Sequence, residues 1–157
     1  MFFAEALALA VPFVPAQRRL REYLRTDGLL QRACDAALHH ALNGLFTDDA
    51  APVTFRTVTL PPYQRGDTMV VALRTTGGNP PAAPLVPIID ANLELRPGDD
   101  HTTHLELRGS YHPPGSINPD RAADGQSGHD ARRTAAGLLR RIAGALARPV
   151  AQDAALT

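Results

Sequence analysis

The 157-residue sequence contains no lysine, no tryptophan and a single cysteine, Cys34. All 16 of its basic residues are therefore arginines, and 16 acidic residues bring the formal net charge to zero. One cysteine excludes an internal disulfide framework and a cysteine-rich zinc site. Zero net charge gives no reason to expect a nucleic-acid partner, because domains that bind nucleic acid usually carry a basic excess.

Long apolar runs are also scarce. The first fourteen residues are strongly apolar, but no basic residue precedes Arg18 and Glu5 interrupts the run, so a secretory signal is not expected. Pro12 and Pro15 end the run well before the roughly 20 residues that a membrane helix needs. We therefore expect a cytoplasmic protein with no membrane partner. A chain of this length fits one domain and buries roughly 68–70% of its unfolded surface, enough for a full apolar core.

The hydrophobic pattern of the first third predicts one strand followed by two helices. Residues 2–11 alternate between two faces, as a strand does. Pro15 suits the first turn of a helix, and residues 26–28 interrupt the helical pattern before a second helix begins. Asn43-Gly44 suits the end of that second helix. The apolar stripe of the second helix consists of Leu30, Ala33, Cys34, Ala37, Leu38, Ala41, Leu42 and Leu45.

The middle of the chain changes to the period of strands. Residues 53–60 and 68–75 are rich in β-branched side chains. Residues 88–96 and 102–112 alternate cleanly, and a Pro-Gly-Asp-Asp turn separates them. Each of these last two segments has one apolar and one charged face. They therefore predict an antiparallel sheet that is wetted on one side only.

A long helix is predicted near the end of the chain, over residues 131–147, with Asp130 as its N-terminal cap. Residues 113–129 lack any periodicity and are expected to form a long connection. The apolar stripe of the closing helix consists of Ala135, Leu138, Leu139, Ile142, Ala145 and Leu146.

This order of elements resembles the helix-grip fold of the START-like, polyketide cyclase/dehydrase (SRPBCC) superfamily. The closest local match is the block LELRGSYHPP at 105–114 before the closing helix, which is similar to an L-x-G-x-Y-x-P-P strand end in small bacterial members. The resemblance implies an α+β fold in which a curved antiparallel sheet wraps around a long C-terminal helix. It makes residues 1–148 a single helix-grip domain and residues 149–157 a frayed tail. The polar stretch 115–130 departs from the family pattern, in which the strand often runs almost directly into the closing helix.

The residues offer little for metal or nucleophilic chemistry. Adjacent residues on a helix point about 100° apart, so His39 and His40 cannot hold one metal from one face. His104 and His112 share a strand face but lie too far apart for a common metal. Cys34 lies in an apolar stripe, where a free cysteine usually behaves as a small buried hydrophobe. We therefore expect no metal and no cofactor.

What the resemblance implies instead is a mostly apolar pocket between the sheet and the closing helix, which would bind a hydrophobic or aromatic small molecule. Tyr111 is the best polar candidate in it, because its ring can be buried while its hydroxyl seeks a partner. Gly109 is expected to mark a bend of the strand that helps to open the cavity. The other predicted contact residues are Leu105, Leu107, Ile89, Ala91, Leu93, Leu138, Leu139 and Ile142.

Two further functions remain open at this point. One is an enzyme of the cyclase or dehydratase type that acts on a polyketide-like substrate, with Tyr111 as the donor and Glu5 or Arg74 beside it. The other is a non-catalytic interaction module whose interior is filled by side chains. The polar residues that the alternation places on the inward faces of the strands are Glu5, Thr57, Thr103, Tyr111 and Arg74. The sequence leaves the ligand and the oligomeric state open.

Overall fold

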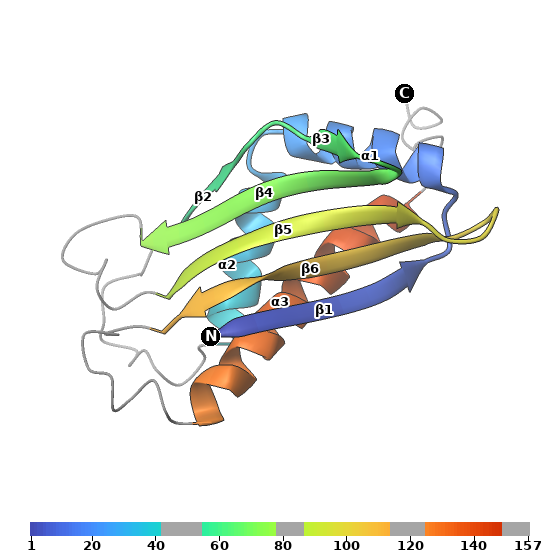
Figure 1. Cartoon of the computed structure of the whole chain (residues 1–157). Helices are drawn as coiled ribbons and strands as arrows, with labels where there is room; N and C mark the ends of the chain where they lie inside the picture. Colours follow the sequence, from blue (N-terminus) through green and yellow to red (C-terminus); the bar gives the residue numbers. More distant parts are fainter. Residues whose placement is uncertain (42–54, 78–86, 114–124, 149–157) are drawn as a thin grey trace.

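The computed structural model describes residues 1–41, 55–77, 87–113 and 125–148. Its strands form one antiparallel sheet in the order β1-β6-β5-β4-β2, and β3 also pairs with β4. Three helices lie on one face of this sheet (Figure 1). The elements are β1 (Phe2–Leu9), α1 (Phe13–Arg25), α2 (Leu29–Ala41), β2 (Phe55–Thr59), β3 (Tyr63–Arg65), β4 (Thr68–Gly77), β5 (Ile88–Pro97), β6 (Thr103–His112) and α3 (Gly125–Ala147).

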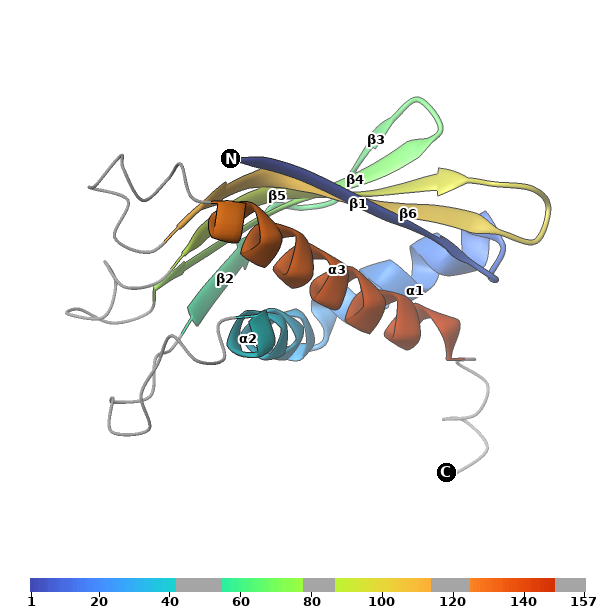
Figure 2. The same cartoon turned by 90° about the horizontal axis from the view of Figure 1, so that it is seen from below.

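The sheet and the helices form two layers, and the long α3 runs beneath the curved sheet (Figure 2). The backbone of α3 approaches β1 and β6 most closely, whereas α2 packs against β2 and α3. A curved antiparallel sheet that holds a long C-terminal helix, with two shorter helices after the first strand, is the helix-grip arrangement. The predicted fold class is therefore confirmed. None of the described helices is both long and apolar enough to span a membrane.

The predicted faces of β5 and β6 are also confirmed. We call the face that packs against the helices the inner face and the opposite face the outer face. On β5, Ile89, Ala91 and Leu93 are buried on the inner face, whereas Asp90 and Asn92 are partly exposed on the outer face. The inner-face residues of the sheet and the apolar stripes of the helices form one continuous core. The described part of the chain thus buries its apolar residues as the alternation requires.

Three details differ from the prediction. Residues 63–65, which lie between the predicted strands 53–60 and 68–75, form the short strand β3, because the positive φ of 63° at Gly66 makes a tight hairpin between β3 and β4. Helix α3 begins at Gly125, so Asp130 lies within it and is not its cap; the Asp130 carbonyl accepts a hydrogen bond from Thr134 Oγ1 at 2.8 Å. Weak helix formers at 125–129 conceal this start in the sequence. The predicted stop at Asn43-Gly44 and the tail 149–157 lie outside the described residues.

The close approach expected at Gly109 is confirmed. A Cβ atom at this position would lie 2.1 Å from the backbone oxygen of Asp90 and 2.6 Å from the Cα of Ala91. Any other residue would collide with the neighbouring strand, so β6 can follow its path beside β5 only with glycine here.

Candidate functional site

The inner face of the sheet carries an unusual cross-strand row near one end of the sheet. Thr57 of β2 is paired with Thr75 of β4, Thr75 with Ile89 of β5, and Ile89 with Tyr111 of β6. We call these four residues the inner-face row. Three of the four carry a hydroxyl group, whereas on β4, β5 and β6 the next three rows of the inner face are apolar; the neighbouring row on these strands, for example, consists of Leu73, Ala91 and Gly109. Three hydroxyl groups are thus gathered at this end of the sheet, and the buried Thr103 lies in the row at the other end.

Two hydroxyl groups of the row have no hydrogen-bond partner within the described residues. They are Oγ1 of Thr57 and Oγ1 of Thr75, and both atoms are buried. Thr75 as a whole is 0% exposed. A buried hydroxyl without a partner costs about 1–3 kcal/mol of stability, and native proteins seldom leave such groups unexplained.

Helix α2 fixes the β2 side of the row. The Gln31 side chain donates from Nε2 to the carbonyl oxygen of Phe55 at 2.8 Å, and the backbone N–H of Thr57 donates to Gln31 Oε1 at 2.7 Å. These two bonds hold β2 against α2.

Burial raises the pKa of the Cys34 thiol to about 11, and the nearby Thr57 hydroxyl opposes this shift. Cys34 is therefore an inert, protonated thiol in the core, as its place in the apolar stripe predicts.

Tyr111 closes the row on the β1 side. Its backbone N–H donates to the carbonyl oxygen of Met1 at 2.8 Å, which ties β6 to the start of the chain. The residue is 1% exposed. Burial raises the pKa of Tyr111 far above its usual range, and the negative charge of Asp130 raises it further. The phenol is therefore neutral at physiological pH and can both donate and accept a hydrogen bond.

The predicted contact residues are all placed in the interior. None is more than 7% exposed, and together with α3 they form the contiguous core. The principal hollows lined by described residues, however, all lie at the surface and not between the sheet and α3. The residues placed in the core are Tyr111, Leu105, Leu107, Ile89, Ala91, Leu93, Leu138, Leu139 and Ile142.

The structure does not assemble the acid–base group considered for an enzyme. Glu5 is on the inner face but half-exposed, because β1 is an edge strand of the sheet. The inward orientation expected for Arg74 is wrong: it lies on the outer face, 58% exposed, and its Nε is 3.3 Å from Asp90 Oδ1. The alternation of β4 puts Thr75 inward and therefore Arg74 outward. Thr57, Thr103 and Tyr111 do face inward. Among the described residues, no group of three His, Cys, Asp or Glu side chains is placed so that it could hold a metal ion.

A second hollow on the other side of the sheet was not expected from the sequence. It has a volume of about 560 Å³ and opens on the outer face. The signal available in the sequence was the pair of apolar residues Val58 and Leu60 in an otherwise polar edge. Both are unusually exposed for their type, Val58 at 50% and Leu60 at 62%. The lining of this outer-face hollow comprises Val58, Leu60, Ala72, Leu73, Arg74, Asp90, Ala91, Asn92, Arg108 and Gly109.

No protein-family model matches the chain, and no curated protein matches it in sequence. Among solved structures, a conserved protein from Geobacillus kaustophilus is 13% identical with a TM-score of 0.55, and the match covers 94% of this chain and 95% of that one. This likeness supports the fold alone.

Two structural neighbours have informative names but lower scores. An aromatase/cyclase from a Streptomyces species is 15% identical with a TM-score of 0.41, covering 96% of this chain and 97% of that one. The lipid transfer and protein localization domain of human StarD13 is 11% identical with a TM-score of 0.41, covering 95% and 78%. Such scores carry no argument about what this chain binds. The resemblance to the START-like superfamily holds for the helix-grip fold, which the element order and packing establish.

Proposed function

We propose that this protein binds a small apolar or aromatic molecule that carries one hydroxyl or carbonyl group, held in the interior against the inner-face row, where the core must open to admit it because the principal hollows lie at the surface. The observation that carries the proposal is the buried hydroxyl group of Thr75, which has no partner, with the Thr57 hydroxyl, which faces only the Cys34 thiol, beside it. A ligand oxygen between them would supply the missing hydrogen bonds, and a polar group that is satisfied only on binding is a common source of specificity.

The surroundings of the row favour an apolar body for this ligand. Phe55, Ile89 and Leu38 are buried in the same core, and the neutral phenol of Tyr111 offers a further donor or acceptor. The remaining predicted contacts, such as Leu107 and Leu138, would form the apolar walls. One or two polar anchors in an apolar interior is the usual composition of a small-molecule site.

The chemistry of the row favours binding over catalysis. Removal of a proton from a polyketide-like substrate needs a base beside the donor. The two partners considered for Tyr111 are not available there, because Glu5 lies at the sheet edge and Arg74 lies on the outer face. A neutral phenol and two threonine hydroxyl groups can orient a carbonyl group, but they do not supply that base.

The test compares 1-naphthol with naphthalene in a binding titration, after native mass spectrometry of the freshly purified protein for any retained ligand. One neutral hydrogen bond is worth about 0.5–1.5 kcal/mol, so naphthol should bind about 2–12-fold more tightly than naphthalene. Thr75→Val should remove most of this preference, and Tyr111→Phe should reduce it. Thr103→Val, which alters a buried threonine in another row, is the matched control and should leave the preference intact.

A clean mass without ligand, together with no binding of either probe, would overturn the proposal. It would favour instead the filled-core interaction module. Equal affinities of naphthol and naphthalene for the unmodified protein would also contradict it, because the inner-face row would then contribute nothing to recognition.

A further inference from the structure

The outer-face hollow is formed by the sheet and its edge. It lies over β4, β5 and β6, beside the exposed apolar side chains that follow β2. Its volume of about 560 Å³ falls within the range of roughly 300–1,000 Å³ that is usual for small-molecule sites. The backbone N–H of Leu60 donates to the carbonyl oxygen of Ala72 at 3.0 Å, so the apolar wall is fastened to the edge of β4.

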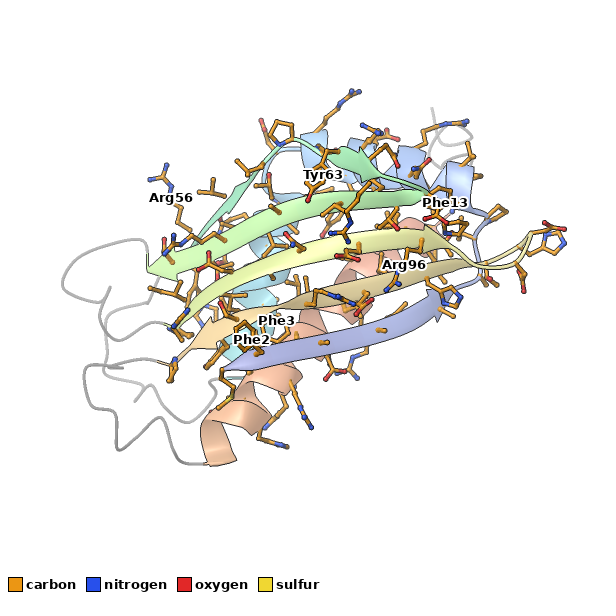
Figure 3. The ribbon with its side chains drawn as sticks, in the orientation of Figure 1. Phe2, Phe3, Phe13, Arg56, Tyr63 and Arg96 are labelled. Atoms are coloured by element: carbon orange, nitrogen blue, oxygen red, sulfur yellow. The ribbon has the colours of Figure 1, made fainter. Side chains whose placement is uncertain are left out.

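The sequence explains why the outer face is hollowed at this place. Ala72, Asn92 and Arg108 are neighbours across β4, β5 and β6, and the first of them carries only a methyl group. Gly109, an inner-face residue that comes very close to the backbone of β5, also lines the hollow. Larger side chains on either side, among them Arg74, therefore enclose a low area of the sheet (Figure 3 looks onto this face).

The polar groups of the hollow point to an anionic partner. Arg108 donates from Nε to Glu106 Oε1 at 3.1 Å and from Nη2 to the same oxygen at 2.5 Å, which fixes the guanidinium plane. The guanidinium group has five donors, so others remain available to a ligand. The side-chain amide of Asn92 has no hydrogen-bond partner within the described residues. Two arginines and one carboxylate, Asp90, line the hollow; Arg74 is paired with Asp90, whereas Arg108 keeps free donors beside its bonds to Glu106.

We propose that the outer-face hollow is a second binding site, for a flat aromatic molecule that carries a carboxylate group. The aromatic body lies over Val58, Leu60 and Ala72, and the carboxylate accepts hydrogen bonds from Arg108 and Asn92. A guanidinium group held in one plane is suited to a carboxylate, which it binds through two parallel hydrogen bonds, and to the face of an aromatic ring. This site is on the opposite face of the sheet from the inner-face row and does not depend on the interior ligand.

The test is a titration of the full chain with 1-naphthoate, followed through the backbone amide signals of Ala72 and Gly109 and the side-chain amide of Asn92. We expect saturable shifts of these signals. Arg108→Gln should weaken binding about 10-fold or more, because a hydrogen bond to a charged group is worth about 1.5–3 kcal/mol. Ala72→Phe should abolish binding by filling the hollow.

Arg96→Gln is the matched control. Arg96 also pairs with Glu106, and Figure 3 labels it on the same face, but it does not line the hollow. Its loss should change the affinity for naphthoate less than about two-fold, because an exposed ion pair contributes little. An equal loss in the Arg96 and Arg108 variants would overturn the proposal, since both would then act only through Glu106.

Two further probes test the ligand chemistry. Neutral 1-naphthalenemethanol should bind much more weakly than naphthoate, and inorganic phosphate should not displace naphthoate. If the neutral probe binds as tightly as naphthoate, the claim that the site recognises a carboxylate is wrong. If phosphate displaces naphthoate, the claim that the site requires an aromatic body is wrong. Naphthoate shifts confined to Thr75 and Tyr111 would place the probe in the interior and overturn the outer site. Thr75→Val, which weakens only the interior site, should leave naphthoate affinity unchanged.

Discussion

Replacement of Thr75 by valine should stabilise the protein in the absence of ligand. The Thr75 hydroxyl is fully buried and has no partner within the described residues. Valine has nearly the same shape but replaces the hydroxyl with a methyl group. The desolvation penalty of an unpaired hydroxyl, about 1–3 kcal/mol, is then removed. We expect the free energy of unfolding to rise by about 1–2 kcal/mol, and the melting temperature by about 2–4 °C for each kcal/mol in a chain of this size.

Thr103→Val provides the matched control. Thr103 is also 0% exposed and also lies on the inner face, but its Oγ1 donates to the carbonyl oxygen of Val11 at 2.7 Å. The same chemical change there removes a hydrogen bond and leaves the carbonyl oxygen of Val11 without its donor. The free energy of unfolding should therefore fall by about 1–3 kcal/mol. The two substitutions are alike in chemistry and burial, so only the hydrogen bond differs between them.

Urea unfolding of the two variants and the unmodified protein, at the same pH and with m values compared, measures both effects. Opposite signs for the two substitutions are the expected result. If Thr75→Val lowers the free energy of unfolding as much as Thr103→Val does, the Thr75 hydroxyl is satisfied in solution and the argument for the inner-face row fails. A variant that is more stable and binds naphthol less well would show that the unpaired hydroxyl is retained for recognition.

Three further predictions concern other parts of the fold. Gly109→Ala should lower the free energy of unfolding by about 2–3 kcal/mol, because its Cβ would lie 2.1 Å from a backbone oxygen of β5; Gly144→Ala, where a Cβ meets nothing within 4 Å, should instead raise it by up to about 1 kcal/mol in thermal unfolding. The Cys34 thiol pKa is raised from 9.0 to about 11, so the unfolded chain loses this proton first as pH rises. Stability should therefore fall between pH 9 and 11, by at most about 3 kcal/mol, and urea titrations should show that Cys34→Ala loses this part of the pH dependence. Arg65→Met should cost about 1–3 kcal/mol in urea unfolding, because it leaves the carboxylate of Glu94, 3% exposed, without its partner at 3.0 Å; an unchanged midpoint would contradict this.

The course of the chain through the fold could be predicted wherever a segment has a single strong period. Residues 88–96 and 102–112 alternate without interruption, and the structure pairs them as predicted, with Ile89 opposite Tyr111. The start of α3 could not be predicted in the same way. Gly128 is a weak helix former, and a Cβ atom there would lie 3.2 Å from Met1 Sδ. The helix at this point therefore depends on tertiary packing against the start of the chain, and local propensity does not reveal it.

The candidate site divides along the same line. Alternation alone indicated that Tyr111 and Thr57 face inward, because a strand can bury only one of its faces. It did not indicate that Thr57, Thr75 and Tyr111 share one row, since that depends on the register between strands that are distant in sequence. The prediction that Arg74 faces inward was wrong for a related reason, because the burial of the adjacent Thr75 fixes Arg74 on the outer face.

The sequence by itself determined the order of the elements and the identity of the buried face, because both follow from hydrophobic periodicity and turn residues that act locally. The helix-grip architecture came from the resemblance of that order to a known superfamily. Only the tertiary structure decided which hydroxyl groups remain unpaired, where Glu5 meets solvent at the sheet edge, and that a hollow opens behind Ala72 and Gly109. These features depend on strand order, register and the close approach of two backbones. Such long-range contacts leave no periodic signal along the chain.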